Sequence, residues 1–457
     1  MIKEDTISAI STAVGEAGIG IVRMSGECAI EIADKIFQAV NGKKLADISD
    51  RKVTFGQIID SNKDIIDEAV VFVMRSPKSY TREDIVEFQC HGNAVVLQKV
   101  LMRTLESGAR LAERGEFTKR AFLNGRLDLS QAQAVLDVIQ AKTDKALKSA
   151  EDRLSGKISS NIFELKQQIL QMTAYIEAII NFPEDDIESI DMTELENDIN
   201  LAIDDVNKIT KLETEGKILR EGIETAIIGK PNVGKSSLLN FLSRNEKAIV
   251  TEIPGTTRDI IEEYININGI PLKIVDTAGI RNSNDKIEQI GIEKSKLYAE
   301  KAALNLVLFD VSRETDTEDE EIINFVKGKN IIVLLTKSDL PVVGDINLLK
   351  KHFISEEIVP ISVKTGKGID DLHNSIMKKM DNITSELNFV KNARELEILK
   401  RIEKHLKEAK NTLKLNIGID LISIDLCSAL EALNELTGES INEDIINEIF
   451  SKFCVGK

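Results

Sequence analysis

The stretch Gly229-Lys-Pro-Asn-Val-Gly-Lys-Ser236 decides the fold of the middle of this chain. It matches the pattern G-x₄-G-K-S, follows an apolar run at residues 226–228 and precedes a helical run that begins at Ser237. A strand, a glycine-rich loop and a helix in this order form a phosphate-binding loop, or P-loop. Its backbone N–H groups surround phosphate oxygens, and the helix N-terminus adds positive potential. We therefore expect a nucleoside triphosphate site here.

Two side chains of this loop have expected roles of their own. Lys235 would reach the β and γ phosphates, and the Ser236 hydroxyl would ligate Mg²⁺. The nucleotide contacts expected from this segment are Asn232, Val233, Gly234, Lys235, Ser236 and Ser237.

A second motif, at residues 336–339, selects the base. Asp339 follows the apolar run at residues 331–335, and its carboxylate can accept hydrogen bonds from guanine N1–H and N2–H₂, which adenine does not offer. Lys337 would lay its stem along the base. The usual first residue of this motif is Asn, so Thr336 predicts weaker loop tethering with guanine specificity retained. The last base contacts are expected from Ser362, Val363 and Lys364.

Two further segments would respond to the γ-phosphate. The motif at residues 276–279 ends an apolar run, so Asp276 would hold Mg²⁺ through water and the Gly279 N–H would contact the γ-phosphate. The loop at residues 255–259 lies where a switch loop belongs, and Thr257 is its natural second Mg²⁺ ligand. The nucleotide contacts expected from the 276–279 motif are Asp276, Thr277, Ala278 and Gly279.

The residue that should position the attacking water is missing. Ras-like enzymes place a glutamine directly after this motif, whereas this chain has Ile280, whose apolar side chain cannot orient water. The nearby acids Asp285 and Glu288 are the candidates for that role.

Three textures of sequence predict a multidomain protein. Strand-like runs separated by helical segments over residues 222–380 predict a mainly parallel, Ras-like α/β sheet. Apolar stripes of helical spacing flank it on both sides, which indicates an all-α helical bundle with the α/β domain inserted, and the first part of the chain reads as α+β. The expected boundaries are 1–118 for the α+β domain, 119–220 and 381–457 for the two helical parts, and 221–380 for the P-loop domain.

Composition excludes several classes of protein. Four widely separated cysteines argue against a disulfide framework or a Cys-based zinc site. No run approaches the roughly 18 apolar residues of a membrane span, and no signal peptide is recognisable, so we expect a cytoplasmic protein without a membrane partner. The net charge of −17 is unfavourable for coating nucleic acid. Seven basic residues against three acidic ones between Lys99 and Arg126 indicate either a local basic surface or an ordinary solvated face.

With these motifs in place, the whole chain resembles the bacterial tRNA-modification GTPases of the MnmE (TrmE) family. The resemblance rests on Pro-Asn-Val-Gly-Lys-Ser in the P-loop and on Gly-Thr-Thr-Arg-Asp at residues 255–259. Outside the α/β domain it rests on Gly-Glu-Phe-Thr-Lys-Arg-Ala-Phe-Leu-Asn-Gly at residues 115–125 and on Phe-Cys-Val-Gly-Lys at residues 453–457.

The resemblance implies an unusual way of neutralising charge during hydrolysis. In this family a K⁺ ion takes the place of an arginine finger, and its matching ligands here are Asn232, Thr251, Ile253 and Thr256. Such loops order when two such domains meet, which implies a homodimer. Glu288 matches the water-positioning acid. The loop's nucleotide contacts would be Thr251, Glu252, Ile253, Pro254, Gly255 and Thr256.

The resemblance also implies a tetrahydrofolate site in the first domain, which is similar to folate-binding domains of the glycine-cleavage T-protein type. Arg23, Glu87, Arg126 and Lys457 match the positions that contact a 5-formyl or 5,10-methylene tetrahydrofolate, and the family more often has Lys where this chain has Arg126. Cys454 is a candidate catalytic thiol, and a buried structural thiol is the alternative.

The implied reaction is the addition of an aminomethyl-type group to C5 of the wobble uridine in tRNA, with an FAD-dependent MnmG-type partner. Two other functions share the P-loop motifs. One is a ribosome-assembly GTPase and the other a signalling GTPase, each acting as a binding switch without modification chemistry.

Overall fold

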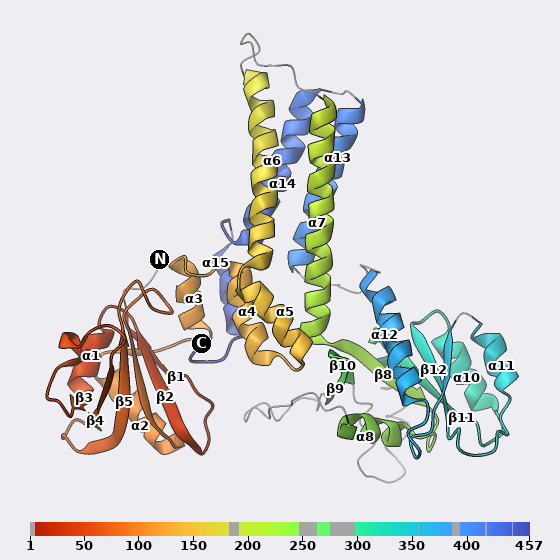
Figure 1. Cartoon of the computed structure of the whole chain (residues 1–457), viewed down its shortest axis with the longest axis horizontal. Helices are drawn as coiled ribbons and strands as arrows, with labels where there is room; N and C mark the ends of the chain where they lie inside the picture. Colours follow the sequence, from red (N-terminus) through yellow and green to blue (C-terminus); the bar gives the residue numbers. More distant parts are fainter. Residues whose placement is uncertain are drawn as a thin grey trace. The chain divides into compact units, whose positions relative to one another are not determined.

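The computed structural model describes residues 5–181, 192–245, 263–274, 298–354, 356–385, 394–415, 418–440 and 442–457. It divides into two compact units. The first contains Met1–Leu136, Arg153–Glu164 and Leu430–Lys457, and the second contains Asp137–Asp152 and Leu165–Ala429. The α+β, helical and α/β parts expected from the sequence are all present (Figure 1). Among the described residues, no helix is long and apolar enough to cross a membrane.

The first unit contains a seven-stranded sheet whose strand order is β3-β4-β5-β6-β2-β1-β7. Neighbouring strands are antiparallel except for β1 and β7. Helices α1 and α2 contribute Ile32 and Leu97 to the same buried cluster as Val22, Met24 and Phe88 of the sheet. The elements are β1 (Ile7–Ile10), β2 (Ala17–Ser25), α1 (Ala29–Ile36), β3 (Phe37–Ala39), a 3-10 helix (Leu45–Asp47), β4 (Val53–Ile59), β5 (Ile65–Met74), β6 (Ile85–Gly92), α2 (Ala94–Glu106) and β7 (Arg110–Leu111).

The last residues of the chain pack against helix α3 (Glu116–Leu123) in this unit. Phe450 of α15 (Glu443–Ser451) lies next to Phe122 and Phe453. The Phe117 N–H donates to the Lys457 carbonyl over 3.2 Å. Gly456 has φ +94°, and a Cβ atom there would lie 2.3 Å from the Ile10 carbonyl oxygen. Only glycine therefore lets the tail lie along β1.

Long helices build the helical part of the chain. In α6 (Lys157–Asn181), the apolar residues predicted to form one stripe include five that are buried. In α13 (Arg394–Leu415), the predicted stripe is buried as well. The buried stripe residues are Ile162, Leu165, Ile169, Met172 and Ile176 in α6, and Leu396, Leu399, Ile402 and Leu406 in α13. The other helices are α4 (Leu129–Gln140), α5 (Asp144–Leu154), α7 (Met192–Glu221) and α14 (Ile419–Thr437).

The second unit contains a six-stranded sheet of order β13-β12-β11-β8-β10-β9, parallel except for the β9–β10 hairpin. Leu306 and Val307 of β11 belong to different apolar clusters, because successive side chains point to opposite faces. One cluster takes in α8 and α12, the other α10 and α11. The bounds are β8 (Ile223–Gly229), α8 (Lys235–Asn245), β9 (Glu263–Ile267), β10 (Ile270–Ile274), β11 (Leu304–Asp310), α10 (Thr317–Val326), β12 (Ile331–Thr336), α11 (Ile346–His352), β13 (Glu357–Pro360) and α12 (Ile369–Ser385).

A single residue, Gly222, separates the end of α7 from the start of β8. Its φ is +78°, and a Cβ atom there would lie 2.8 Å from the Pro271 carbonyl oxygen. Its N–H still donates to the Ile218 carbonyl over 2.9 Å, so the helical hydrogen-bond pattern runs up to the first residue of the strand.

Candidate functional site

The P-loop has the backbone that its sequence predicts. It leaves β8 at Gly229 and enters α8 at Lys235. Gly229 and Gly234 have φ angles of +157° and +109°, and a Cβ atom on Gly229 would lie 2.8 Å from the Leu308 carbonyl oxygen. Asn232 also has positive φ, at +58°. The two motif glycines are therefore required by the path of the backbone, which lets the loop N–H groups turn toward one point.

Lys235 folds over this loop. Its Nζ donates to the carbonyl oxygens of Gly229 and of Lys230, the second at 2.8 Å. Burial lowers the pKa of Lys235. Charged phosphate oxygens are stronger hydrogen-bond acceptors than these neutral carbonyls, so the ammonium group lies ready to exchange one set of partners for the other.

Thr336 ties the end of β12 to the P-loop. Its buried hydroxyl lies 2.8 Å from the Val233 carbonyl oxygen and 3.2 Å from that of Phe309. A hydroxyl has one proton to donate, so it serves one of these acceptors at a time, and Val233 is the nearer. With Thr336 in place of the usual Asn, a single hydroxyl hydrogen bond therefore joins this motif to the P-loop, which is the weaker tether that we expected.

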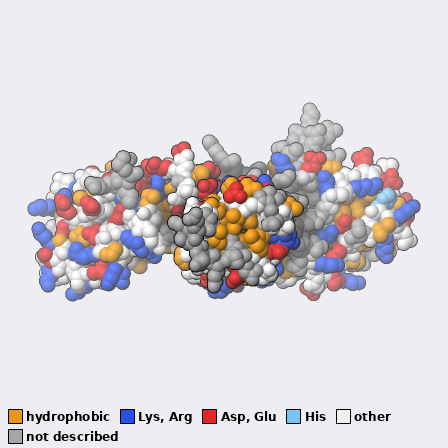
Figure 2. All heavy atoms as spheres, turned by 90° about the horizontal axis from the view of Figure 1, so that it is seen from above, with side chains coloured by type: hydrophobic (Ala, Val, Ile, Leu, Met, Phe, Trp, Pro, Cys, Tyr) orange, Lys and Arg blue, Asp and Glu red, His pale blue; other side chains and the backbone are white. Residues whose placement is uncertain are grey.

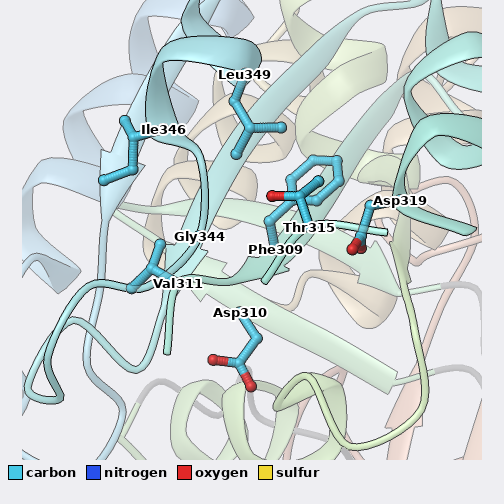
Figure 3. A pocket seen from close by; sticks show the side chains of 8 residues that line it. All are labelled: Phe309, Asp310, Val311, Thr315, Asp319, Gly344, Ile346 and Leu349. Atoms are coloured by element: carbon cyan, nitrogen blue, oxygen red, sulfur yellow. The ribbon is translucent and has the colours of Figure 1, made fainter. Parts of the chain in front are cut away.

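Lys337 is held beside the base-recognition loop by Asp310. Its Nζ donates to Asp310 Oδ2 over 2.6 Å, from a residue whose φ is +58°. Burial acts to raise the pKa of Asp310, but the hydrogen bonds from Lys337 and Ser312 outweigh it, and the pKa lies below its usual value. Figure 3 shows Asp310 at the edge of a small pocket, pointing away from the apolar side chains of Phe309 and Leu349.

Asp339 and Ser362, each predicted to contact the base, are direct neighbours in the structure. The Ser362 hydroxyl donates to Asp339 Oδ1 over 2.7 Å, and this bond lowers the pKa of the exposed Asp339 carboxyl. The Ser338 N–H donates to the Ile361 carbonyl over 3.1 Å, which joins the two loops. The carboxylate is thus ionised at neutral pH, the state that accepts two hydrogen bonds from guanine.

A second site forms around an ion pair in the first unit. Arg23 of β2 and Glu87 of β6 are direct partners across the sheet, and Arg23 Nε donates to Glu87 Oε1 over 2.6 Å. Their side chains are 16% and 15% exposed. The Arg23 Nη1 also reaches the carbonyl oxygen of Gly456 at 3.5 Å, which brings the chain's last residues to the pair.

Tyr80 joins the remaining cations to this pair. The guanidinium carbons of Arg23 and Arg126 lie 5.8 Å and 4.7 Å from the centre of its ring. Burial lowers the pKa of Lys457, and so does the charge of Arg23, while Glu87 acts in the opposite direction. The four residues named for folate, Arg23, Glu87, Arg126 and Lys457, are therefore neighbours in the structure, although 434 positions separate the first from the last.

Relatives over the full length identify the family. The "tRNA modification GTPase MnmE" of Finegoldia magna is 46% identical over 457 residues, covering 99% of this chain and 100% of that protein. The protein of the same name from Thermoanaerobacter pseudethanolicus is 47% identical, with 99% of each chain covered. This chain belongs to the MnmE family. The family's domain models agree, since the MnmE helical domain matches residues 129–454 and the TrmE N-terminus matches residues 6–126.

Membership in the MnmE family makes this chain a GTP hydrolase that acts in tRNA modification. Solved structures also resemble part of it. Aquifex aeolicus Era, bound to GDP and aluminium fluoride, is 30% identical over 40% of this chain and 66% of its own, with a TM-score of 0.28. The FeoB G-domain of Methanococcus jannaschii is 27% identical over 35% of this chain and 98% of its own, with a TM-score of 0.25. Because these TM-scores are low, neither structural similarity carries any conclusion about this chain.

Several predicted site residues of this MnmE-family protein lie outside the described residues. They comprise the switch-loop residues Thr251, Glu252, Ile253, Pro254, Gly255, Thr256 and Thr257, the motif residues Asp276, Thr277, Ala278 and Gly279, and the acids Asp285 and Glu288. The described part of the site is the P-loop and the two base-recognition loops.

The basic stretch at residues 99–126 does not form a continuous basic surface. Arg120 is 4% exposed and lies within 3.2 Å of Asp5, Glu83 and Glu116. Arg110 pairs with Asp5 at 2.7 Å and with Glu116 at 2.6 Å. Arg120 is buried and Arg110 is half-buried, and the charge of each is neutralised by carboxylates of the same unit. On the face drawn in Figure 2, Lys and Arg side chains are likewise interspersed with Asp and Glu over the described residues.

Sequence reasoning missed Tyr80, whose ring lies beside Arg23 and Arg126, and its neighbour Thr118. The Tyr80 hydroxyl lies 2.9 Å from Thr118 Oγ1, and the Arg126 Nη1 donates to the Tyr80 carbonyl over 3.3 Å. Thr118 lies within the motif at residues 115–125, so its position was signalled. Tyr80 belongs to no motif, and only the fold brings it to the ion pair.

Proposed function

We propose that this chain is a K⁺-dependent cytoplasmic GTPase, activated by dimerisation, that works with an FAD-dependent MnmG-type flavoprotein. Together they add an aminomethyl-type group to C5 of the wobble uridine in tRNA, with a one-carbon tetrahydrofolate as donor. Family membership supports the GTPase and the tRNA part of this function. The observation that carries the folate part is the Arg23–Glu87 pair, whose arginine also contacts the Gly456 carbonyl near the end of the chain.

The residues around this pair suit the two ends of a folate. A pterin presents neighbouring amide and amino N–H groups, and Glu87 offers a carboxylate with acceptor capacity beyond its bond to Arg23. The partly exposed ring of Tyr80, which lies 5.8 Å from the Arg23 guanidinium, supplies apolar surface for the pterin. Arg126 and Lys457 supply positive charge for the carboxylates of the glutamate tail.

The folate would supply the one-carbon unit when it is bound, and the residues of this chain would bind and orient it. Arg23 fixes the Glu87 carboxylate in one direction through the 2.6 Å bond. The exposed thiol of Cys454 lies in the same tail, three residues before Lys457, so it is a candidate nucleophile for this site. A 5-formyl or a 5,10-methylene folate fits this description equally.

Calorimetry with 5-formyl tetrahydrofolate tests the folate site. We expect wild-type protein to bind it and Arg23→Ala to lose most of the affinity, because Glu87 is then no longer oriented. Arg51→Ala is a matched control, since Arg51 lies in the same unit and is largely exposed. Absence of binding to wild type, or unchanged binding in Arg23→Ala, would favour a ribosome-assembly GTPase that acts only as a switch.

The P-loop fits the two cations proposed for hydrolysis. Ser236 lies in the first turn of α8, where its hydroxyl can ligate Mg²⁺ together with Thr257. Asn232 is exposed on the loop in a left-handed conformation, so its amide could serve as one of the K⁺ ligands. The other proposed K⁺ ligands are Thr251, Ile253 and Thr256. Positive charge placed there stabilises the charge that develops on the phosphates, as an arginine finger does.

Exchange of K⁺ for Na⁺ tests this ion role. At saturating GTP and Mg²⁺, we expect clearly slower hydrolysis in Na⁺, and we expect Asn232→Ala to remove the difference between the two salts while nucleotide affinity is kept. A sizing measurement with a transition-state analogue should show more dimer in K⁺. Equal wild-type rates in both salts would discredit the ion role of Asn232.

Glu288 is proposed to orient the attacking water in place of the missing glutamine. Glu288→Ala should therefore keep GTP affinity while kcat collapses, because the acid acts on the reaction and not on binding. Asp285→Ala is the matched control. A near-normal kcat in Glu288→Ala would remove this residue from the mechanism.

Nucleoside analysis of tRNA tests the reaction itself. A deletion strain should lack the C5-modified wobble uridine, and a plasmid with this gene should restore it. An unchanged nucleoside profile in the deletion strain would support a signalling GTPase instead.

A further inference from the structure

Three side chains with metal-ligating atoms meet between helices α13 and α14. His405 and Glu408 lie on α13, and Asp425 lies on α14. One ligand atom from each lies within 4.8 Å of the others. We propose that these three residues bind a Zn²⁺ ion that fastens α13 to α14.

The spacing within α13 gives the first part of the argument. Residues three apart on a helix lie on the same face, so His405 and Glu408 can address one point. His405 Nδ1 and Glu408 Oε2 are 3.4 Å apart. Two ligands bound to tetrahedral zinc at 2.0–2.1 Å are separated by about 3.3 Å. The pair therefore already has the separation that a shared zinc ion imposes.

The imidazole nitrogen gives the second part. His405 Nδ1 is buried and has no hydrogen-bond partner, even though the Glu408 carboxylate is close by. A buried polar atom without a partner is rare in a native protein and calls for an explanation such as an ion. A neutral imidazole nitrogen that carries a lone pair is the zinc ligand that this position offers.

The two carboxylates give the third part. Asp425 and Glu408 bring two carboxylate oxygens to within 4.8 Å of each other and of the imidazole. The largely exposed Lys404 lies 3.7 Å from Glu408 Oε1, which is the carboxylate oxygen that does not face His405 Nδ1. A divalent cation among the three ligand atoms would remove the repulsion between the carboxylates.

The ligand set selects the kind of metal. An imidazole with two carboxylates suits zinc, whereas Mg²⁺ prefers oxygen ligands and keeps its waters. Three protein ligands leave one coordination position for water, and the Glu408 side chain is 44% exposed, so the ion can enter from solvent. This site shares no residue with the nucleotide loops or with the folate site, and the proposal does not depend on the proposed function.

Cobalt substitution tests the site in the full chain. With GDP and Mg²⁺ saturating the nucleotide site, Co²⁺ should give the visible absorption of a tetrahedral complex, saturate at one equivalent per chain and be displaced by Zn²⁺. His405→Ala and Asp425→Asn should lose this absorption. His352→Ala, which removes an exposed histidine of α11, should keep it, and the thiols of the chain are the same in all four proteins.

Thermal unfolding gives an independent readout. One equivalent of Zn²⁺ should raise the Tm of wild type and of His352→Ala, and leave that of Asp425→Asn unchanged, because only a bound ion stabilises the folded state. Asn has the size of Asp, and circular dichroism should show unchanged helix content. Absorption that persists in Asp425→Asn, or that grows with excess metal without saturating at one equivalent, would show only adventitious binding and overturn the proposal.

Discussion

The nucleotide loops and the proposed folate site are built in opposite ways. The P-loop is eight consecutive residues, and its shape comes from backbone angles at Gly229 and Gly234. The proposed folate site draws Arg23, Glu87 and Lys457 from distant parts of the chain, and its shape comes from the Arg23–Glu87 ion pair across β2 and β6 and from the contact of Arg23 with the tail. A local backbone motif tolerates change in its surroundings, whereas a site assembled from distant side chains depends on the whole unit being folded.

The strongest way to break the nucleotide site is to remove its lysine. Lys235→Ala should lower kcat/KM for GTP roughly 100- to 1,000-fold, by analogy with the loss of other preorganised charge donors. Hydrolysis assays over a range of GTP concentrations measure it. Binding of 5-formyl tetrahydrofolate should be unchanged, and a parallel loss there would mean that the two sites are not independent. Lys230→Ala is the matched control, because Lys230 pairs with Asp316 of the α10 cap.

Exchanging the base-recognition carboxylate should have the next largest effect. Asp339→Asn should lower GTP affinity about 100-fold, because the amide puts a donor opposite the guanine amino group. Xanthosine triphosphate carries a carbonyl at that position and should bind the variant better than it binds wild type. Fluorescent-nucleotide titrations measure both affinities. If GTP and xanthosine triphosphate change in the same direction, Asp339 does not read the base.

Neutralising Glu87, the carboxylate of the proposed folate site, should have a smaller effect. Glu87→Gln keeps the shape of the side chain and removes its charge, so folate affinity should fall about 10- to 30-fold, the cost of a charge-assisted hydrogen bond. Calorimetry measures it, with Glu68→Gln on β5 as a control elsewhere in the sheet. GTP hydrolysis by the isolated protein should stay within twofold of wild type. Unchanged folate affinity would separate the ion pair from ligand binding.

The smallest effect should come from the tether between the two loops. Thr336→Val preserves the shape and removes the hydroxyl that reaches the Val233 carbonyl. One buried hydrogen bond contributes about 1 kcal/mol, so GTP affinity should fall about fivefold. Stopped-flow nucleotide release measures it. Thr336→Asn supplies the usual residue of the motif and should bind GTP at least as tightly as wild type. Slower nucleotide release from Thr336→Val than from wild type would contradict the tether.

The same contrast explains how much the sequence could predict. Gly229, Lys235 and Asp339 were predictable because each lies in a short motif whose roles follow from spacing alone. Arg23 and Glu87 face each other only through the strand register of β2 and β6, so their roles came from the resemblance to a family. Tyr80 was missed because nothing local marks it.

Charge was the property that sequence predicted least well. The run at residues 99–126 counts as basic in one dimension, but Arg110 and Arg120 point at carboxylates brought from Asp5 and Glu116 by the fold. Local composition reports how many charges a segment carries, and only the tertiary structure decides which of them are neutralised.

The one-residue junction at Gly222 couples the movement of strand β8 to that of helix α7. Strand β8 has seven residues and is about 23 Å long. A displacement of its P-loop end is therefore transmitted over that length to the C-terminal end of α7. Helix α7 has thirty residues and extends about 45 Å from this C-terminal end. A small tilt of α7 at its C-terminal end therefore becomes a larger displacement at its N-terminal end, because no flexible linker between β8 and α7 absorbs the movement.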